Sequence, residues 1–175
     1  DTMVLDDATI SNHASIVPHV INKYYSSEFG IIVLNYFEKD TQKALSAIAE
    51  SDVIYFTGGL PDKMVERIAD YGIIEALSAY KGVVMGFSAG AMIQLDAYHI
   101  TPDEDYPAYC ECRGIGYVKQ MDVEVHFDGS EAQQRGIDQA LRSFGHKVYA
   151  IAEDGLVLVQ DGNVECIGNV TVYGG

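Results

Sequence analysis

Residues 83–91 read VVMGFSAGA. The first three residues form a short apolar run, which is typical of a strand buried on both faces of a parallel sheet. Two glycines then flank Ser88 in the pattern G-x-S-x-G, and a stretch of helical character follows at residues 89–97. A strand, a sharp turn and a helix in this order predict an α/β fold in which Ser88 stands above the carboxyl end of the sheet.

The rest of the chain repeats this alternation of short apolar runs and longer stretches with helical spacing. The best single architecture is three-layered, with a mostly parallel central sheet, helices on both faces and a small antiparallel β extension at the C-terminus. We predict helices at residues 12–27, 40–50 and 130–144 and from Pro61 onward, strands at residues 31–36, 53–56, 83–85 and 121–127, short strands with hairpin turns over 148–172, and a long loop at 101–116.

Length and charge exclude several classes of protein. The 175 residues fit one domain, spanning residues 1–175. A net charge of −15 repels nucleic acids and anionic membrane surfaces, and no run approaches the ~18 apolar residues of a membrane span. The three cysteines are too few for a disulfide scaffold, and the chain starts without a leader pattern, so we expect a cytoplasmic protein. The sequence leaves open whether the protein forms a homo-oligomer.

A serine hydroxyl becomes a nucleophile only beside a base. His126 ends the predicted strand at 121–127, where a parallel strand would deliver it to the same sheet edge as Ser88. We expect His99 elsewhere, because the predicted helix would carry it away from the turn. Each catalytic role has a structural alternative. Ser88 could lie in a plain glycine-rich turn, and His126 could be a structural histidine.

The base in turn needs a carboxylate that orients its ring. Three acids, Asp103, Glu104 and Asp105, lie in the loop between the serine and His126. A solvated turn is at least as good a reading of these acids.

Other motifs favour neither a metal nor a cofactor. Residues 57–59 read TGG and lack the lysine and spacing of a phosphate-binding loop, so they provide either an N–H donor facing Ser88 or only a tight turn. Cys110 and Cys112 have no second pair of ligands at zinc spacing.

Three stretches together resemble one known family. Residues 53–59 (VIYFTGG), 86–91 (GFSAGA) and 124–127 (EVHF) are similar to motifs of the dipeptidase E and cyanophycinase family of serine peptidases. This resemblance covers the chain from about Ser51 to the C-terminus. It implies the class I glutamine amidotransferase-like, flavodoxin-like fold.

The resemblance also implies an activity. Ser88 would attack a peptide or isopeptide bond of a small peptide and form an acyl-enzyme, with His126 as base and the backbone N–H groups of Gly59 and Ala89 as oxyanion hole. The family's spacing between serine and acid lands on Asp103, and Glu104 is the rival that the cyanophycinase arrangement implies.

The sequence departs from the family at its beginning and near its base. Only residues 3–5 hint at the two strands that precede the family's first helix, so part of the sheet could lie outside this chain. Glu124 and Val125 replace the Asn-Pro that comes before the family's histidine. Two alternative functions therefore stay open: a catalytically inactive binding module and an esterase that uses the same turn.

Overall fold

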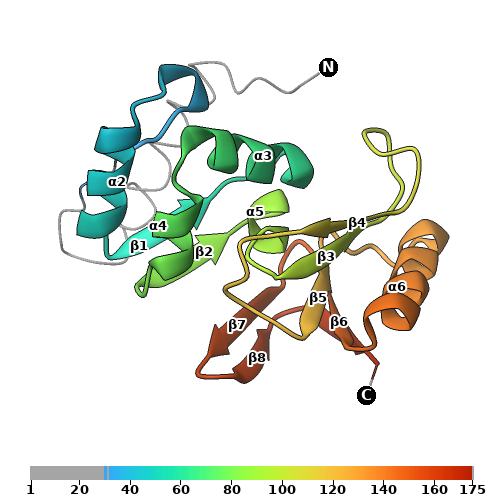
Figure 1. Ribbon diagram of the computed structural model, residues 1–175. Helices are drawn as coiled ribbons and strands as arrows, with labels where there is room; N and C mark the ends of the chain where they lie inside the picture. The colour runs from blue at the N-terminus through green and yellow to red at the C-terminus, as the bar shows by residue number, and fades with distance from the viewer. Residues whose placement is uncertain (1–29, 31, 175) are drawn as a thin grey trace.

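The computed structural model describes residue 30 and residues 32–174 (Figure 1). The helix predicted at 12–27 and the strand hint at 3–5 lie outside these residues. None of the helices in the described ranges is long and apolar enough to cross a membrane. The elements are η1 (Tyr36–Glu38), α2 (Thr41–Glu50), β1 (Val53–Phe56), α3 (Pro61–Tyr71), α4 (Ile74–Ala79), β2 (Val83–Gly86), α5 (Ala89–Met92), β3 (Ala97–Ile100), β4 (Cys110–Arg113), β5 (Met121–Glu124), α6 (Glu131–Phe144), β6 (Lys147–Ile151), β7 (Leu156–Gln160), β8 (Asn163–Ile167) and β9 (Val170–Tyr173).

The strands pair in both directions. β1 and β2 run parallel, and so do β5 and β6, so the two strands of each pair end at the same edge. β3 pairs antiparallel with β4, β9 adds antiparallel to β6, and β7 and β8 form a hairpin. The predicted α/β class and the antiparallel C-terminal extension are confirmed.

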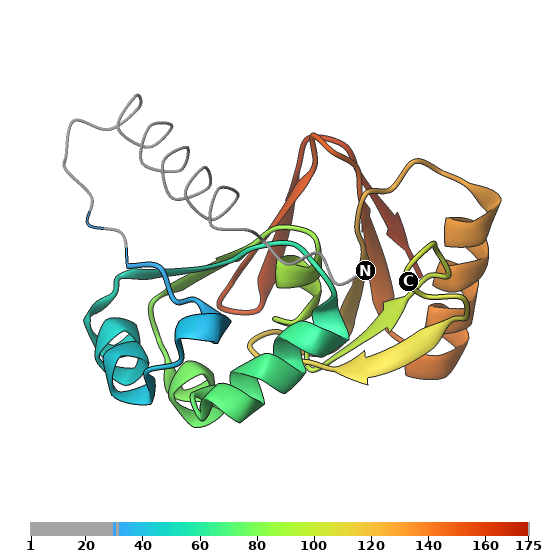
Figure 2. The same ribbon diagram turned by 90° about the horizontal axis from the view of Figure 1, so that it is seen from above.

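Helices α2, α3 and α4 lie on one side of β1 and β2 (Figure 2). Ile54 and Phe56 pack against the buried cluster of these helices, which includes Ile48 and Leu77. Side chains on the opposite face of the two strands are exposed, including Tyr55. Among the residues that the structure describes, helices thus cover only one face of this strand pair.

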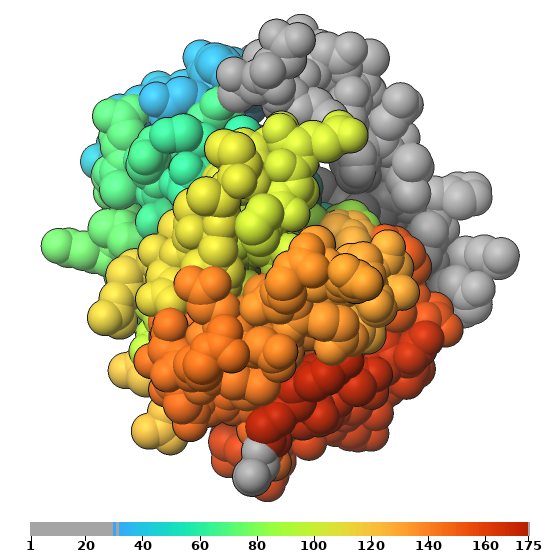
Figure 3. Space-filling view, turned by 90° about the vertical axis from the view of Figure 1, so that its right-hand side faces the viewer, coloured from blue at the N-terminus to red at the C-terminus, as the bar shows by residue number. Residues whose placement is uncertain are grey.

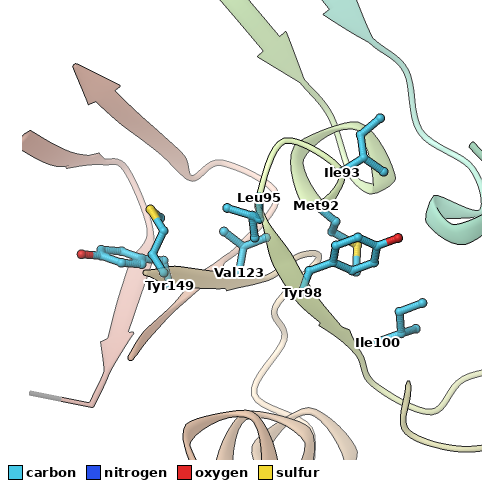
Figure 4. Packing of buried hydrophobic residues seen from close by; sticks show 8 residues of the cluster. Met92, Ile93, Leu95, Tyr98, Ile100, Val123 and Tyr149 are labelled. Carbon is cyan, nitrogen blue, oxygen red and sulfur yellow. The ribbon is translucent and has the colours of Figure 1, made fainter. Parts of the chain in front are cut away.

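A second apolar core joins the turn at Ser88 to the rest of the molecule. Met92 and Ile93 follow the turn and pack with Tyr98 of β3 and Val123 of β5 (Figure 4). Helix α6 packs against β6 through a separate small cluster that includes Ile137. Ser130 caps the start of α6 and Gly145 its end, as the sequence suggests for a helix over 130–144.

Three predicted elements are wrong. The helix expected at 89–97 ends at Met92, because the chain turns and enters β3 at Ala97. The loop expected at 101–116 contains β4, whose backbone pairs with β3. The strand expected at 31–36 is not formed at residues 32–36, and Tyr36 begins a short 3-10 helix instead. For β3 and β4, the pairing of the two segments with each other outweighed the local pattern.

Candidate active site

Ser88 lies in a strained turn between β2 and α5. Its backbone has φ 55° and ψ −122°, a region that non-glycine residues rarely occupy and that costs roughly 1–3 kcal/mol. The N–H of Phe87 donates to the carbonyl of Phe56 at 3.1 Å and fixes the turn to β1. The surrounding structure therefore holds Ser88 in one unusual conformation, as a nucleophile elbow requires.

The two glycines of the motif are needed for steric reasons. A Cβ atom at Gly90 would lie 2.2 Å from the carbonyl oxygen of Phe56. One at Gly86 would lie 2.1 Å from the carbonyl oxygen of Gly90. Both distances are far inside van der Waals contact, so the packing of the turn against β1 depends on glycine at position 90, and the tightness of the turn itself depends on glycine at position 86.

A cavity of about 310 Å³ opens beside this turn. Ser88 and His126 both line it, together with Gly59, Ala89 and Asp103. Gly59 has φ 137°, a conformation that favours glycine. The structure thus brings most of the predicted site residues to one cavity, while Glu104 is exposed and does not line it.

His126 follows β5 by two residues. The next N–H, that of Phe127, donates to the carbonyl of Ile151 at 2.9 Å and so fixes this segment to the end of β6. The imidazole lies edge-on to the ring of Phe87, with centroids 5.4 Å apart. Its side chain is 44% exposed, and its Nδ1 contacts a carboxylate oxygen of Glu153.

The acid on His126 is therefore Glu153, which the sequence analysis did not consider. Asp103 instead accepts the backbone N–H groups of Asp105 and Tyr106, at 2.9 and 2.8 Å, in a turn of its own loop. The expected hydrogen bond from His126 to Asp103 or Glu104 is replaced by the contact with Glu153. Glu153 follows β6, the parallel neighbour of β5, and both strands end at the same edge. The sequence predicts both strands but not that they are neighbours, so it gives no signal for this contact.

His99 also differs from its expected position. It is buried on β3 and lines the cavity, because the helix after Ser88 is short and the chain turns back. Its Nδ1 lies 2.6 Å from Asp122 and its Nε2 2.7 Å from Glu124. Burial lowers the pKa of His99, but the hydrogen bonds and charges of the two carboxylates outweigh burial and raise this pKa to about 9.

The described part of the chain contains no group of three or more His, Cys, Asp or Glu residues placed to hold a metal ion. Cys110 and Cys112 are free thiols on β4. The cavity instead combines a serine in a nucleophile elbow, an imidazole oriented by a carboxylate, and backbone N–H groups nearby. That set of groups can transfer an acyl group.

Three comparisons with known proteins bear on this site. A model of Peptidase family S51 matches residues 5–167. The crystal structure of a peptidase from an acI-B1 Actinobacterium superposes with a TM-score of 0.67 at 16% identity, covering 97% of this chain and 75% of that one. A protein assigned as a peptidase E from Listeria monocytogenes EGD-e gives a TM-score of 0.64 at 14% identity, covering 95% and 79%. No curated protein sequence matches the chain.

Proposed function

Because the chain belongs to peptidase family S51, a family of serine peptidases, we propose that it hydrolyses a peptide or isopeptide bond of a small peptide through an acyl-enzyme on Ser88. The observation that carries this proposal is the contact between His126 Nδ1 and Glu153 at the cavity that Ser88 lines. It supports a base that is already oriented for proton transfer.

In this mechanism each group has one task. His126 Nε2 takes the proton of the Ser88 hydroxyl as the oxygen attacks the carbonyl carbon, and it then gives that proton to the departing amine. Water then enters, gives a proton to the same nitrogen and attacks the acyl carbon. The bond between the acyl carbon and Ser88 Oγ breaks, and Oγ takes the proton back from Nε2. The N–H groups of Gly59 and Ala89 stabilise the oxyanion.

Glu153 is the orienting acid of this proposal, in place of Asp103 and Glu104. By accepting a hydrogen bond from the N–H group at His126 Nδ1, Glu153 keeps Nε2 free to face the serine. It also stabilises the imidazolium that forms during attack. Asp103 makes no hydrogen bond to His126 in the described residues, and its Oδ1 accepts two amides of its own loop.

The size of the cavity favours a small substrate. A volume of about 310 Å³ is at the lower end of ligand pockets and accommodates one or two amino-acid residues more readily than a long chain. We therefore propose a peptidase that acts on short peptides.

Labelling with a fluorophosphonate probe tests the proposal, because only an activated serine reacts. We expect stoichiometric labelling at Ser88, located by peptide mass spectrometry, and its loss in Ser88→Ala. His126→Ala should label far more slowly, since the base is missing. A folded wild-type protein that resists the probe would instead be a binding module with an inactive elbow.

Two matched substrates then separate a peptidase from an esterase. A dipeptide and the corresponding depsipeptide, in which an ester replaces the amide, differ only in the leaving atom. We expect measurable turnover of the dipeptide, whereas an esterase would hydrolyse the ester alone.

A further inference from the structure

The cavity at Ser88 has an acidic wall. Among the described residues, no lysine or arginine lines it. Figure 3 shows the yellow-green segment that follows β3 next to the orange α6, and both segments contribute residues to the lining of the cavity. The carboxylates that line the cavity belong to Asp103, Asp105, Glu124 and Asp128.

Glu124 differs from the other three carboxylates because it is buried. It is only 7% exposed, whereas the other three side chains lie in exposed loops. Asp103 and Asp128 also accept backbone N–H groups of their own loops, so local turns already occupy them. Glu124 is thus the one acid on this wall that the fold itself has removed from water.

Glu124 is held through one of its two oxygens. Its Oε2 accepts the hydroxyl of Thr101 at 2.6 Å and lies 2.7 Å from His99 Nε2. Within residues 30 and 32–174, no side chain or backbone N–H donates to Oε1. Glu124 therefore lines the cavity, is more than nine-tenths buried, and has one carboxylate oxygen that accepts no hydrogen bond from the described residues.

The buried cluster around Glu124 carries an excess of negative charge. When both carboxylates are ionised, an imidazole hydrogen-bonded to the two of them carries a proton on each ring nitrogen, and the pKa of His99, about 9, agrees with such a protonated ring at neutral pH. One positive charge then stands against the two negative charges of Asp122 and Glu124. An unbalanced buried charge is costly, and a cation that enters the cavity would relieve this cost.

We propose that Glu124 binds a positively charged group of the substrate, an ammonium or guanidinium group, and thereby makes this site prefer cationic peptides. This inference rests on the proposed function of Ser88. His99 and Asp122 act as positioning residues, because Asp122 holds the His99 ring and His99 holds the Glu124 carboxylate.

The position of Glu124 limits where the cation can be. It ends β5 only two residues before His126, and two residues of extended chain span roughly 7 Å. The positive group should therefore belong to one of the two residues joined by the scissile bond. It can be a terminal ammonium or a basic side chain, and the experiment has to separate these sources.

Three pairs of dipeptides, each differing by one positive charge, test the proposal. Lys-Ala is compared with norleucine-Ala, Ala-Lys with Ala-norleucine, and Ala-Ala with its Nα-acetyl form. Each peptide is scored by the concentration that halves the rate of fluorophosphonate labelling of Ser88, and by kcat/KM where it is cleaved. A hydrogen-bonded ion pair at a buried acid predicts a preference of about 10- to 100-fold for the charged member of at least one pair.

Glu124→Gln removes the charge and keeps the shape, so the preference of the charged member should fall to about threefold or less. Thr101→Val is the second variant, which loosens the hold on Oε2 and should also reduce the preference. Asp105→Asn is the matched control, because it removes an exposed charge from the same wall and should preserve most of the preference.

The outcomes separate the two proposals. If the probe does not label the wild-type protein, both the proposed function and this inference are wrong. A labelled protein with no preference in any pair, or with a preference that survives Glu124→Gln, overturns the inference alone. The pair that shows the preference identifies the source of the cation.

Discussion

At the scale of single residues, the choice of acid decides how His126 works. Replacing Glu153 with Gln keeps the side chain's size but removes the charge that fixes the ring and stabilises the imidazolium. We expect Glu153→Gln to lower kcat/KM by on the order of 10²- to 10⁴-fold, with an unchanged melting temperature, because the exposed pair contributes little to folding.

Asp103→Asn is the matched control for that measurement, since it alters an acid at the same cavity that does not contact His126. It should reduce kcat/KM by less than tenfold. If Asp103→Asn lowered kcat/KM strongly and Glu153→Gln did not, Asp103 would be the acid, as the resemblance implied.

The strained backbone of Ser88 leads to a second prediction for a single residue, which concerns stability. Ser88→Ala should abolish turnover and leave the strain in place, whereas Ser88→Gly should abolish turnover and relieve it. We expect the glycine variant to exceed the alanine variant by about 1 kcal/mol in free energy of unfolding. Urea denaturation of both variants measures this difference, and equal stabilities would mean that the turn is not strained.

At the scale of elements, α6 lies unusually close to the end of β3. A Cβ atom at Gly136 would stand 2.2 Å from the hydroxyl oxygen of Thr101, which also holds Glu124. Alanine is the better helix former by up to ~1 kcal/mol, but overpacking typically costs about 1–3 kcal/mol. We therefore expect Gly136→Ala to lower the melting temperature despite its helix propensity.

A double variant provides the control for this contact. Thr101→Ala removes the clashing oxygen, so Gly136→Ala should be better tolerated in its presence than alone. Effects that simply add would mean that α6 and β3 are not in contact at this point.

At the scale of the whole molecule, the buried His99 links stability to pH. Its pKa is about 9 in the folded protein and near 6.5 when unfolded, so the folded state holds a proton that the unfolded state releases. The stabilisation is complete below pH ~6.5 and is lost as the pH rises through about 9. We expect the free energy of unfolding to fall across this range by on the order of 3 kcal/mol.

Urea denaturation of the wild type and His99→Gln at several pH values separates this effect from other titrating groups, because the difference between the two proteins should shrink toward pH 9. The imidazole signal of His99 in NMR spectra of the wild type should titrate near pH 9. A midpoint near 6.5 would contradict the prediction.

The sequence by itself determined the elements whose signals are local. The run at β1 and the glycines that end it, the G-x-S-x-G turn after β2, and α6 between Ser130 and Gly145 all depend on residues within a few positions of one another. The patterns can be recognised within one turn of chain, even though the steric demand for Gly90 comes from Phe56 of β1. The sequence could therefore indicate Ser88 and His126 as members of one site, although β2 and β5 lie in separate sheets and the two residues meet at a cavity.

The tertiary structure alone decided which other side chains join them. Glu153 reaches His126 because β6 runs parallel beside β5, and His99 reaches Glu124 because β3 and β5 place these distant residues in contact. The sequence around Glu153 reads as an ordinary hairpin turn, and that around His99 as the continuation of a helix. Strand pairing depends on the packing of residues far apart in the chain, so no local pattern could specify these contacts.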